Sequence, residues 1–288
     1  MMATANNETS SASDLGLHDV AFVDGPLPAQ LRAQVFVLET EILVYHFMYV
    51  SYNISAKRKP AGGGPLEWED KCGLIQDARF RLVLHALDAD TDTNVFVAAS
   101  EDRVMVGFRG TVSLANVRTD IDSALVRHPL GHRVKPLLGR ARSSAEHARA
   151  SSPAFVHQGF LTAYNSVRSQ VVAAVSSLVR ENPRRVVFVT GHSLGGGLAC
   201  LCAFDFAVAL KIPVDHLALT TWGCPRVGNY SFARRFARAV PVATRFVCEG
   251  DIITRLPFTP PFQDVTFHGW FHCGVEVLLK PSGVSLTT

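Results

Sequence analysis

The chain has 288 residues, of which 48% are hydrophobic and 18% charged, and this composition excludes a disordered, collagenous or low-complexity protein. Its length suffices for a large core that needs no disulfide or metal to hold it together. The formal net charge of +3 is far from the strongly basic balance of dedicated nucleic-acid binders, so we expect no nucleic-acid partner.

The N-terminal segment is small and polar, and it lacks the basic and apolar regions of a secretory signal. We therefore expect a disordered leader over residues 1–18 and a single domain over residues 19–288. No uncharged apolar run reaches the roughly 18 residues that a membrane span requires. These features predict a protein that is cytoplasmic or peripherally bound to a membrane. None of the six cysteines forms a CxxC pair, so we expect mostly free thiols.

The first part of the domain combines one helix with a group of strands. Apolar residues dominate residues 28–56 without strict alternation, which predicts one long, largely buried helix. Residues 57–64 form a basic turn rich in Gly and Pro. Three β-rich runs follow, and their short, turn-prone separations predict strands that meet in hairpins at residues 82–87, 94–99 and 103–108.

The stretch 127–152 differs in composition from the rest of the chain. It carries six Arg or Lys and one Glu, with prolines, serines and no apolar periodicity. We interpret it as an exposed basic insertion, and a patch for an anionic membrane surface is the functional alternative. Residues 153–182 then predict a helix, which Pro183 stops.

Strands and helices alternate in the second half of the chain. Residues 185–190 form a continuous β-branched run of the kind that is buried on both faces of a parallel sheet. A helix at 198–211, a strand at 217–221, a helix at 230–239 and a strand at 244–248 follow. This order predicts an α/β protein with a mainly parallel central sheet flanked by helices.

A GxSxG pentapeptide, residues 191–195, lies between the predicted strand and helix. In that context it indicates a nucleophile elbow, a turn so tight that glycines are needed on both sides of Ser193. The helix that follows directs its free N–H groups to the place where negative charge would develop on an attacked carbonyl. The motif thus supplies a nucleophile and an oxyanion donor from one turn.

A serine hydroxyl needs a histidine base that a carboxylate orients, in the chain order Ser, Asp or Glu, His. Asp251 follows a predicted strand at its carboxyl end, where open α/β sheets gather functional groups. Glu249 is the neighbouring alternative, but it remains close to the register of the strand. We therefore take Asp251 as the acid.

These residues resemble the class 3 lipases, a family of α/β hydrolases that includes the fungal triacylglycerol lipases and plant acylhydrolases. The resemblance covers about residues 80 to 280 in family order. The matching blocks are Val104–Thr111, Val156–Phe160, Gly191–Gly196, Thr221–Asn229, Asp251–Pro257 and Phe271–Val277.

The resemblance implies an α/β-hydrolase fold with Ser193 as nucleophile and Asp251 as triad acid. It also implies that Thr111 and Leu194 contribute N–H groups to the oxyanion hole. No metal or cofactor is expected, because the chemistry relies on an activated nucleophile and preorganised dipoles. Residues 112–126 correspond to the lid over the acyl site. Within them the chain has Asn-Val-Arg-Thr-Asp at residues 116–120, where the family commonly has a tryptophan after the asparagine.

The triad histidine is the point where the chain departs from the family. The only histidines after Asp251 are His268 and His272. His272 lies in a block whose histidine is not the base in the family, where a later segment supplies it. Three alternatives follow: the sequence is C-terminally incomplete, His272 or else His268 has taken the role, or the fold lacks a working triad.

The sequence thus predicts a serine hydrolase that cleaves carboxylic esters of lipids through an acyl-enzyme. The resemblance alone implies a lipid ester as the substrate, and we expect peripheral contact to a membrane or lipid-droplet surface. The alternative is a catalytically impaired, lipase-like binding or regulatory module.

Overall fold

A computed structural model describes residues 38–52, 79–110, 124–136, 144–258 and 269–287. The expected leader at 1–18 and the expected basic turn at 57–64 lie outside these ranges.

Eight strands of the described residues form one sheet, in the order β1-β2-β3-β6-β7-β8-β9-β10. Their bounds are β1 Arg81–Asp88, β2 Thr93–Ala99, β3 Arg103–Phe108, β6 Val186–His192, β7 Leu217–Trp222, β8 Ala243–Cys248, β9 Val275–Lys280 and β10 Gly283–Thr287. The central strands from β3 to β9 are parallel, and antiparallel hairpins extend both edges. This is the mainly parallel sheet that the sequence predicts.

Strand β6 is one of the two middle strands of the sheet, and it pairs in parallel with β3 on one side and β7 on the other. Val187 and Val189 have no exposed surface, as expected for a β-branched strand covered on both faces. Parallel pairing brings the carboxyl ends of β6, β7 and β8 to the same edge. That edge carries the GxSxG motif and Asp251.

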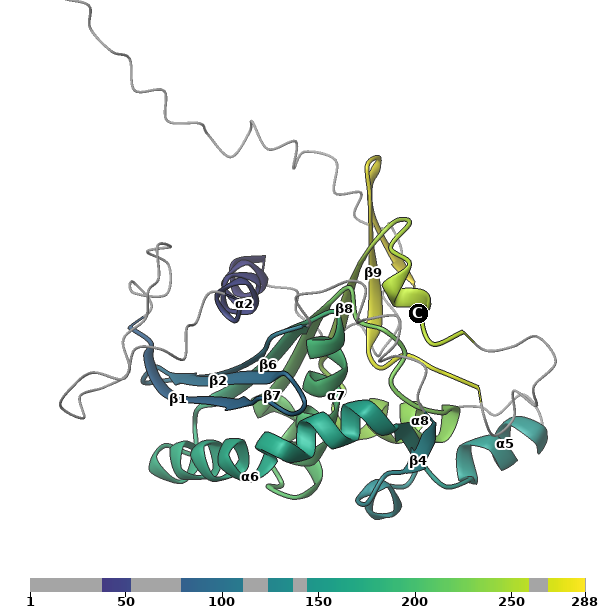
Figure 1. Ribbon diagram of the computed structural model, residues 1–288, viewed down its shortest axis with the longest axis horizontal. Helices are drawn as coiled ribbons and strands as arrows, with labels where there is room; N and C mark the ends of the chain where they lie inside the picture. Colours follow the sequence, from purple (N-terminus) through teal and green to yellow (C-terminus); the bar gives the residue numbers. More distant parts are fainter. Residues whose placement is uncertain (1–37, 53–78, 111–123, 137–143, 259–268, 288) are drawn as a thin grey trace, which may run out of the picture.

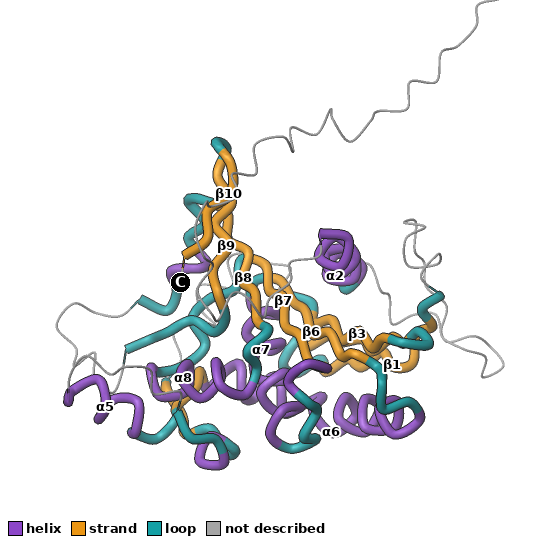
Figure 2. Tube along the Cα trace, turned by 180° about the vertical axis from the view of Figure 1, so that it is seen from behind, coloured by secondary structure: helices purple, strands orange, loops and turns teal. Residues whose placement is uncertain are grey.

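Helices cover both faces of the sheet (Figures 1 and 2). Helix α2 (Leu38–Val50) packs on β3 and β6 on one face, whereas α6 (Gln158–Glu181) and α7 (Leu194–Val208) pack on the opposite face. Helix α8 (Tyr230–Ala239) lies against α7. None of the helices in the described ranges has the length and apolar character that crossing a bilayer requires.

Helix α2 ends earlier than the helix predicted over residues 28–56. Within the described residues α2 stops at Val50, because the chain turns at Ser51. The Ser51 hydroxyl donates to the Met48 carbonyl at 2.6 Å, a local side-chain bond that competes with continuation of the helix.

The basic insertion and the helix predicted after it also need correction. Residues 144–151 of the insertion form helix α5. Phe155–His157 form strand β5, which pairs with β4 (Leu125–Arg127). The first two residues of β4 are the end of the expected lid segment. Helix α6 therefore begins at Gln158, where the His157 ring accepts the Phe160 N–H as an N-cap.

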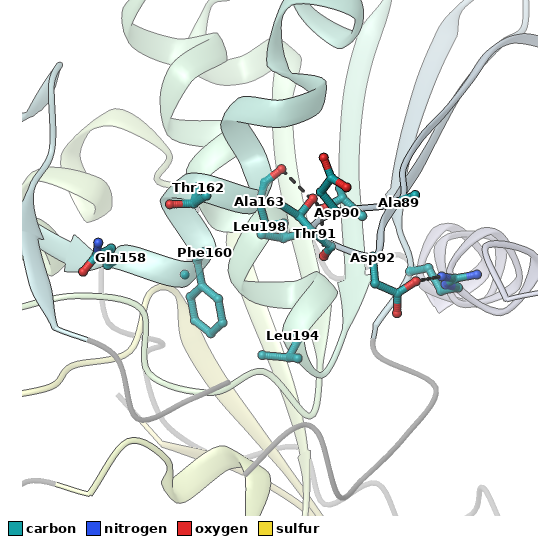
Figure 3. Close-up of a pocket in the computed structure, with 13 residues that line it drawn as sticks. Ala89, Asp90, Thr91, Asp92, Gln158, Phe160, Thr162, Ala163, Leu194 and Leu198 are labelled. Atoms are coloured by element: carbon teal, nitrogen blue, oxygen red, sulfur yellow. Dashed lines mark hydrogen bonds and ion pairs between the residues drawn. The ribbon is translucent and has the colours of Figure 1, made fainter. Parts of the chain in front are cut away.

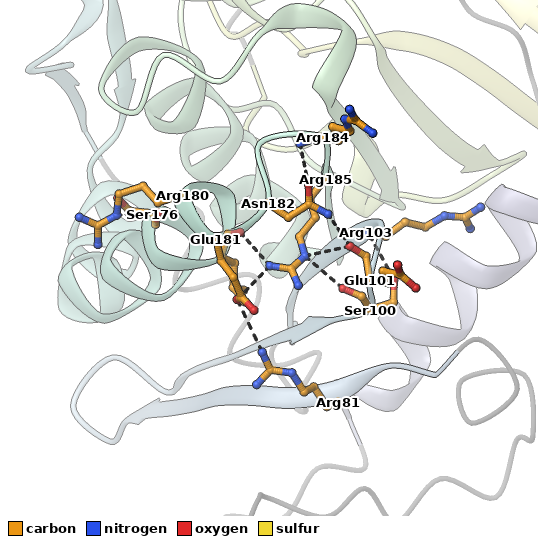
Figure 4. A network of polar contacts seen from close by, with 11 residues as sticks. Arg81, Ser100, Glu101, Arg103, Ser176, Arg180, Glu181, Asn182, Arg184 and Arg185 are labelled. Atoms are coloured by element: carbon orange, nitrogen blue, oxygen red, sulfur yellow. Dashed lines mark hydrogen bonds and ion pairs between the residues drawn. The ribbon is translucent and has the colours of Figure 1, made fainter.

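The end of the sheet away from the GxSxG motif is held by Arg185, which is 6% exposed (Figure 4). Its guanidinium donates to the carbonyls of Ser100 and Leu178 and to the Glu181 carboxylate. One side chain thereby ties the β2–β3 turn to the end of α6 and the start of β6. The described cysteines are free thiols, as predicted.

Candidate active site

Ser193 joins β6 directly to α7, and its backbone is strained. Its φ of 54° is a conformation that costs a non-glycine residue roughly 1 to 3 kcal/mol. The Ser193 N–H donates to the Trp222 carbonyl of β7 at 2.9 Å, and the Ser193 carbonyl accepts the Gly196 N–H at 2.9 Å. Helix α7 thus starts at Leu194, earlier than predicted, with Ser193 as its N-cap.

The glycines of this elbow, residues 191–195, are needed because backbone approaches them closely. A Cβ on Gly191 would overlap the Gly195 carbonyl oxygen, and a Cβ on Gly195 would lie 2.5 Å from the Phe108 carbonyl oxygen. Neither position can carry a side chain without moving main chain. The tight turn predicted from the motif is therefore present.

The end of β3 also runs against the elbow. A Cβ on Gly110 would lie 2.5 Å from the His192 carbonyl oxygen and 3.3 Å from the Ser193 Cβ. Thr111 follows Gly110 in the chain but lies outside the described residues. Leu194 is the first residue of α7, where N–H groups have no partner within the helix. Its N–H is available to negative charge beside Ser193.

Asp251 lies just beyond β8 at the same edge of the sheet. Its Oδ1 accepts the Ile253 N–H at 2.9 Å, and its Oδ2 lies 2.9 Å from the place where Gly223 would carry a Cβ. The His192 Nε2 lies 3.6 Å from that same point. Gly223, with φ of +55°, has no side chain, and the absence of a Cβ lets the Asp251 carboxylate and the His192 ring approach each other. Glu249 is exposed, and its N–H continues the strand pairing with Leu279.

Tyr52 is a site residue that the sequence did not reveal. Its hydroxyl lies 2.7 Å from His192 Nδ1, and the two rings meet at 5.8 Å and 62°. Burial lowers the pKa of His192, although the charge of Asp251 acts in the opposite direction. The ring is therefore neutral at neutral pH. Tyr52 fell inside a predicted helix, and no motif marked it.

His272 lies among cations. Burial and the nearby guanidinium groups of Arg245 and Arg226 lower the pKa of His272 to about 3, against hydrogen bonds with the backbone of Thr254 and Pro225. Its buried Nδ1 has no hydrogen-bond partner within the described part of the chain. Among the described residues, no hydrogen bond or ion pair joins His272 to Ser193 or Asp251. His268 lies outside the described residues.

A hollow of about 480 Å³ adjoins Leu194 (Figure 3). Phe160, Leu194 and Leu198 give it apolar walls. Asp90 and Asp92 of the β1–β2 turn line another side, where Asp92 accepts a hydrogen bond from Arg109 at 2.7 Å. The hollow therefore offers both apolar and polar surface beside the N-terminus of α7. No cluster of three or more His, Cys, Asp or Glu in the described ranges could hold a metal ion.

Comparisons with known proteins agree with this geometry. The family model for lipase (class 3) matches residues 105–260. The lipase of Rhizomucor miehei is 32% identical over 206 residues, which are 71% of this chain and 49% of that protein. The secreted mono- and diacylglycerol lipase 2 of Gibberella zeae is 33% identical over 174 residues, 59% of this chain and 39% of that protein.

The solved structure of lipase II from Rhizopus niveus superposes with a TM-score of 0.67 at 25% identity, covering 87% of this chain and 84% of that one. The chain thus has the fold of these lipases. It spans about half the length, or less, of the curated relatives that it matches.

Proposed function

Because the chain belongs to the class 3 lipase family, we propose that it cleaves carboxylic esters of lipids, such as acylglycerols or phospholipids, through an acyl-enzyme. The observation that carries the proposal is the strained backbone of Ser193 at the start of α7, with Asp251 at the same sheet edge. The names of relatives point to such substrates, since one is a mono- and diacylglycerol lipase and another a phospholipase A1.

In the proposed reaction the Ser193 Oγ attacks the ester carbonyl and gives its proton to a histidine base. The oxyanion accepts hydrogen bonds from the N–H groups of Leu194 and Thr111. Collapse of this intermediate breaks the ester bond, and the alcohol leaves with the proton from the base. Water, activated by the same base, then hydrolyses the acyl-enzyme. Asp251 orients the base throughout.

The identity of the base needs a direct test. We propose His272, with His268 as the alternative. The surroundings of His272 oppose this role, because a pKa of about 3 and two arginine neighbours disfavour the imidazolium form. That observation favours a second candidate function, a lipase-like module that binds a lipid ester without turning it over.

The function test is hydrolysis of p-nitrophenyl butyrate and palmitate by the full chain and by variants. Ser193→Ala should abolish hydrolysis, whereas Ser169→Ala, at an exposed position of α6, should leave it unchanged. Loss of activity in His272→Ala or His268→Ala, but not in both, would name the base. A folded wild-type protein without activity would contradict hydrolysis and support the binding module.

We also propose that the protein contacts a membrane or lipid-droplet surface through the basic segment 127–152. Arg127, Arg133 and Lys135 of this segment are exposed. Binding to vesicles with anionic lipid should weaken from low to high salt, since surface charges are screened within about 10 Å at 0.1 M. Binding that does not change with salt would contradict this contact.

A further inference from the structure

We propose that Tyr52 is a positioning residue of the active site, which through His192 holds the elbow against the end of β3. The inference rests on the proposed function and assigns a task to helix α2, whose residues lie outside the span of the family match. Tyr52 would touch no reacting atom. It would act on the group that carries the nucleophile.

Helix α2 is anchored firmly enough to place this side chain. Phe47 is fully buried and stacks on Phe96 of β2 at 5.9 Å. Tyr45 meets the Trp222 ring edge-on at 5.1 Å, just before Gly223. The chain then turns at Ser51, so that Tyr52 reaches the sheet edge where β3 and β6 end.

The Tyr52 hydroxyl lies between two parts of the site. It is 2.7 Å from His192 Nδ1 and 2.5 Å from the place where Gly110 would carry a Cβ, a point only 3.3 Å from the Ser193 Cβ. Burial raises the pKa of the Tyr52 hydroxyl, and the adjacent backbone of Gly110 acts in the opposite direction. One hydroxyl thus bridges the residue before Ser193 and the residue before Thr111.

The contacts also select one tautomer of His192. His192 Nε2 shares the space over Gly223 with the Asp251 carboxylate, which can only accept. We therefore assign the ring proton of neutral His192 to Nε2, and Nδ1 then accepts the phenolic proton of Tyr52. The tautomer that pairs with Tyr52 thus places a donor near the proposed triad acid.

This bridge has a partner on the other side of the elbow. The Ser193 N–H is held by the Trp222 carbonyl of β7, whereas the Tyr52 hydroxyl holds His192 from the α2 side. Two such contacts restrain the strained turn from opposite directions. Loss of the hydroxyl removes one of them and leaves the Nδ1 of a largely buried ring unpaired.

The test compares Tyr52→Phe with Tyr45→Phe in the full chain. Both variants keep the ring and remove a hydroxyl, but Tyr45 is 43% exposed and touches Trp222 only through its ring. Two readouts are needed. The first is kcat and KM for p-nitrophenyl butyrate, with the rate at which a fluorophosphonate labels Ser193. The second is the ¹⁵N NMR signal of the His192 ring, assigned with His192→Gln.

We expect Tyr52→Phe to lower kcat and the labelling rate roughly five- to tenfold, the equivalent of one hydrogen bond, with KM unchanged. The wild-type His192 signal should show protonation on Nε2 and a hydrogen-bonded Nδ1, and this hydrogen-bond signature should vanish in Tyr52→Phe alone. Tyr45→Phe should match the wild type in both readouts.

Equal kcat in Tyr52→Phe and Tyr45→Phe, with an active wild type, would overturn the inference and leave the proposed function intact. An unchanged His192 signal in Tyr52→Phe would overturn it as well. A folded wild type that neither hydrolyses ester nor is labelled would instead refute the proposed function, and the catalytic part of the inference with it.

Discussion

Helix α7 carries two buried polar centres that differ in how their groups are paired. At its N-terminus Ser193 is 6% exposed, has a backbone φ of 54° and makes no side-chain cap bond. Further along, Asp205 is 2% exposed, and its carboxylate accepts the Tyr164 hydroxyl at 2.8 Å and two nitrogens of Arg168 at 2.8 and 2.9 Å. One centre is strained and the other is fully paired.

The difference separates a site from a structural anchor. A buried carboxylate whose partners satisfy it stabilises the packing of α6 on α7 and has no capacity left for a ligand. A strained serine at the N-terminus of a helix, where the first N–H groups have no partner within the helix, has capacity for developing charge. Burial of a polar residue alone would not distinguish the two. The predictions below ask whether stability and labelling can be changed independently at these two centres.

The largest expected effect on stability is at the anchor. Asp205→Asn should lower the free energy of unfolding by about 3 kcal/mol, because Arg168 and the buried Tyr164 lose a charged acceptor. Urea denaturation measures this loss. Asp215→Asn, at an exposed position, is the control and should change stability little. A slower labelling of Ser193 in folded Asp205→Asn would contradict the separation of the two centres.

Gly223→Ala should affect both stability and the site. Its φ of +55° and a Cβ 2.9 Å from the Asp251 Oδ2 should together cost about 2 kcal/mol and displace that carboxylate. Gly250→Ala is a matched control, because its φ is +86° and its Cβ would meet nothing within 4 Å. Only Gly223→Ala should slow labelling of Ser193. Equal labelling in both variants would contradict the placement of Asp251 in the site.

His128, near the anchor, should make the protein acid-sensitive. Burial lowers the pKa of His128 from 6.5 to about 4, with Asp205 opposing and Arg168 adding to the shift. Between these values the unfolded chain binds more protons, so the stability present above pH 6.5 is lost as the pH falls. The loss approaches about 1.4 kcal/mol per pH unit.

Denaturation at several pH values tests this dependence. His128→Gln should flatten the dependence between pH 6.5 and 4, whereas His132→Gln, at an exposed position of the same segment, should leave it unchanged. An equal slope in His128→Gln and the wild type would show that other groups cause the acid sensitivity.

The smallest effect is expected at the nucleophile itself. Ser193→Gly should raise the free energy of unfolding by about 1 kcal/mol, because glycine adopts a positive φ without strain. The control Ser169→Gly, inside α6, should lower it by a similar amount. Opposite signs at the two serines would support stored strain at the elbow, whereas a loss of stability in both would contradict it.

Strong local patterns predicted much of this fold. The strand at 103–108 and the helix at 230–239 have the predicted bounds. The strand is a β-rich run in which every residue after Arg103 is buried, and the helix buries residues at helical spacing, such as Phe232 and Phe236. The GxSxG motif located the elbow because its glycines are required by backbone contacts within a few residues. Class 3 family membership is confirmed by the match over residues 105–260.

Features that depend on distant contacts could not be read from the sequence. Strand β5 exists because it pairs with β4 and bridges to Gly228, so no local pattern separated it from α6. Tyr52 contacts His192 across 140 positions of sequence. The roles of Thr111, of lid residues 112–123 and of His268 stay predictions, since these residues lie outside the described ranges.

The most direct test of the central claim is peptide mass spectrometry of the full chain after reaction with a fluorophosphonate. The account predicts a single adduct on Ser193, no adduct in Ser193→Ala and an unchanged adduct in Ser169→Ala. An adduct on another residue, or none on a folded wild-type protein, would contradict the assignment of Ser193 as an activated nucleophile.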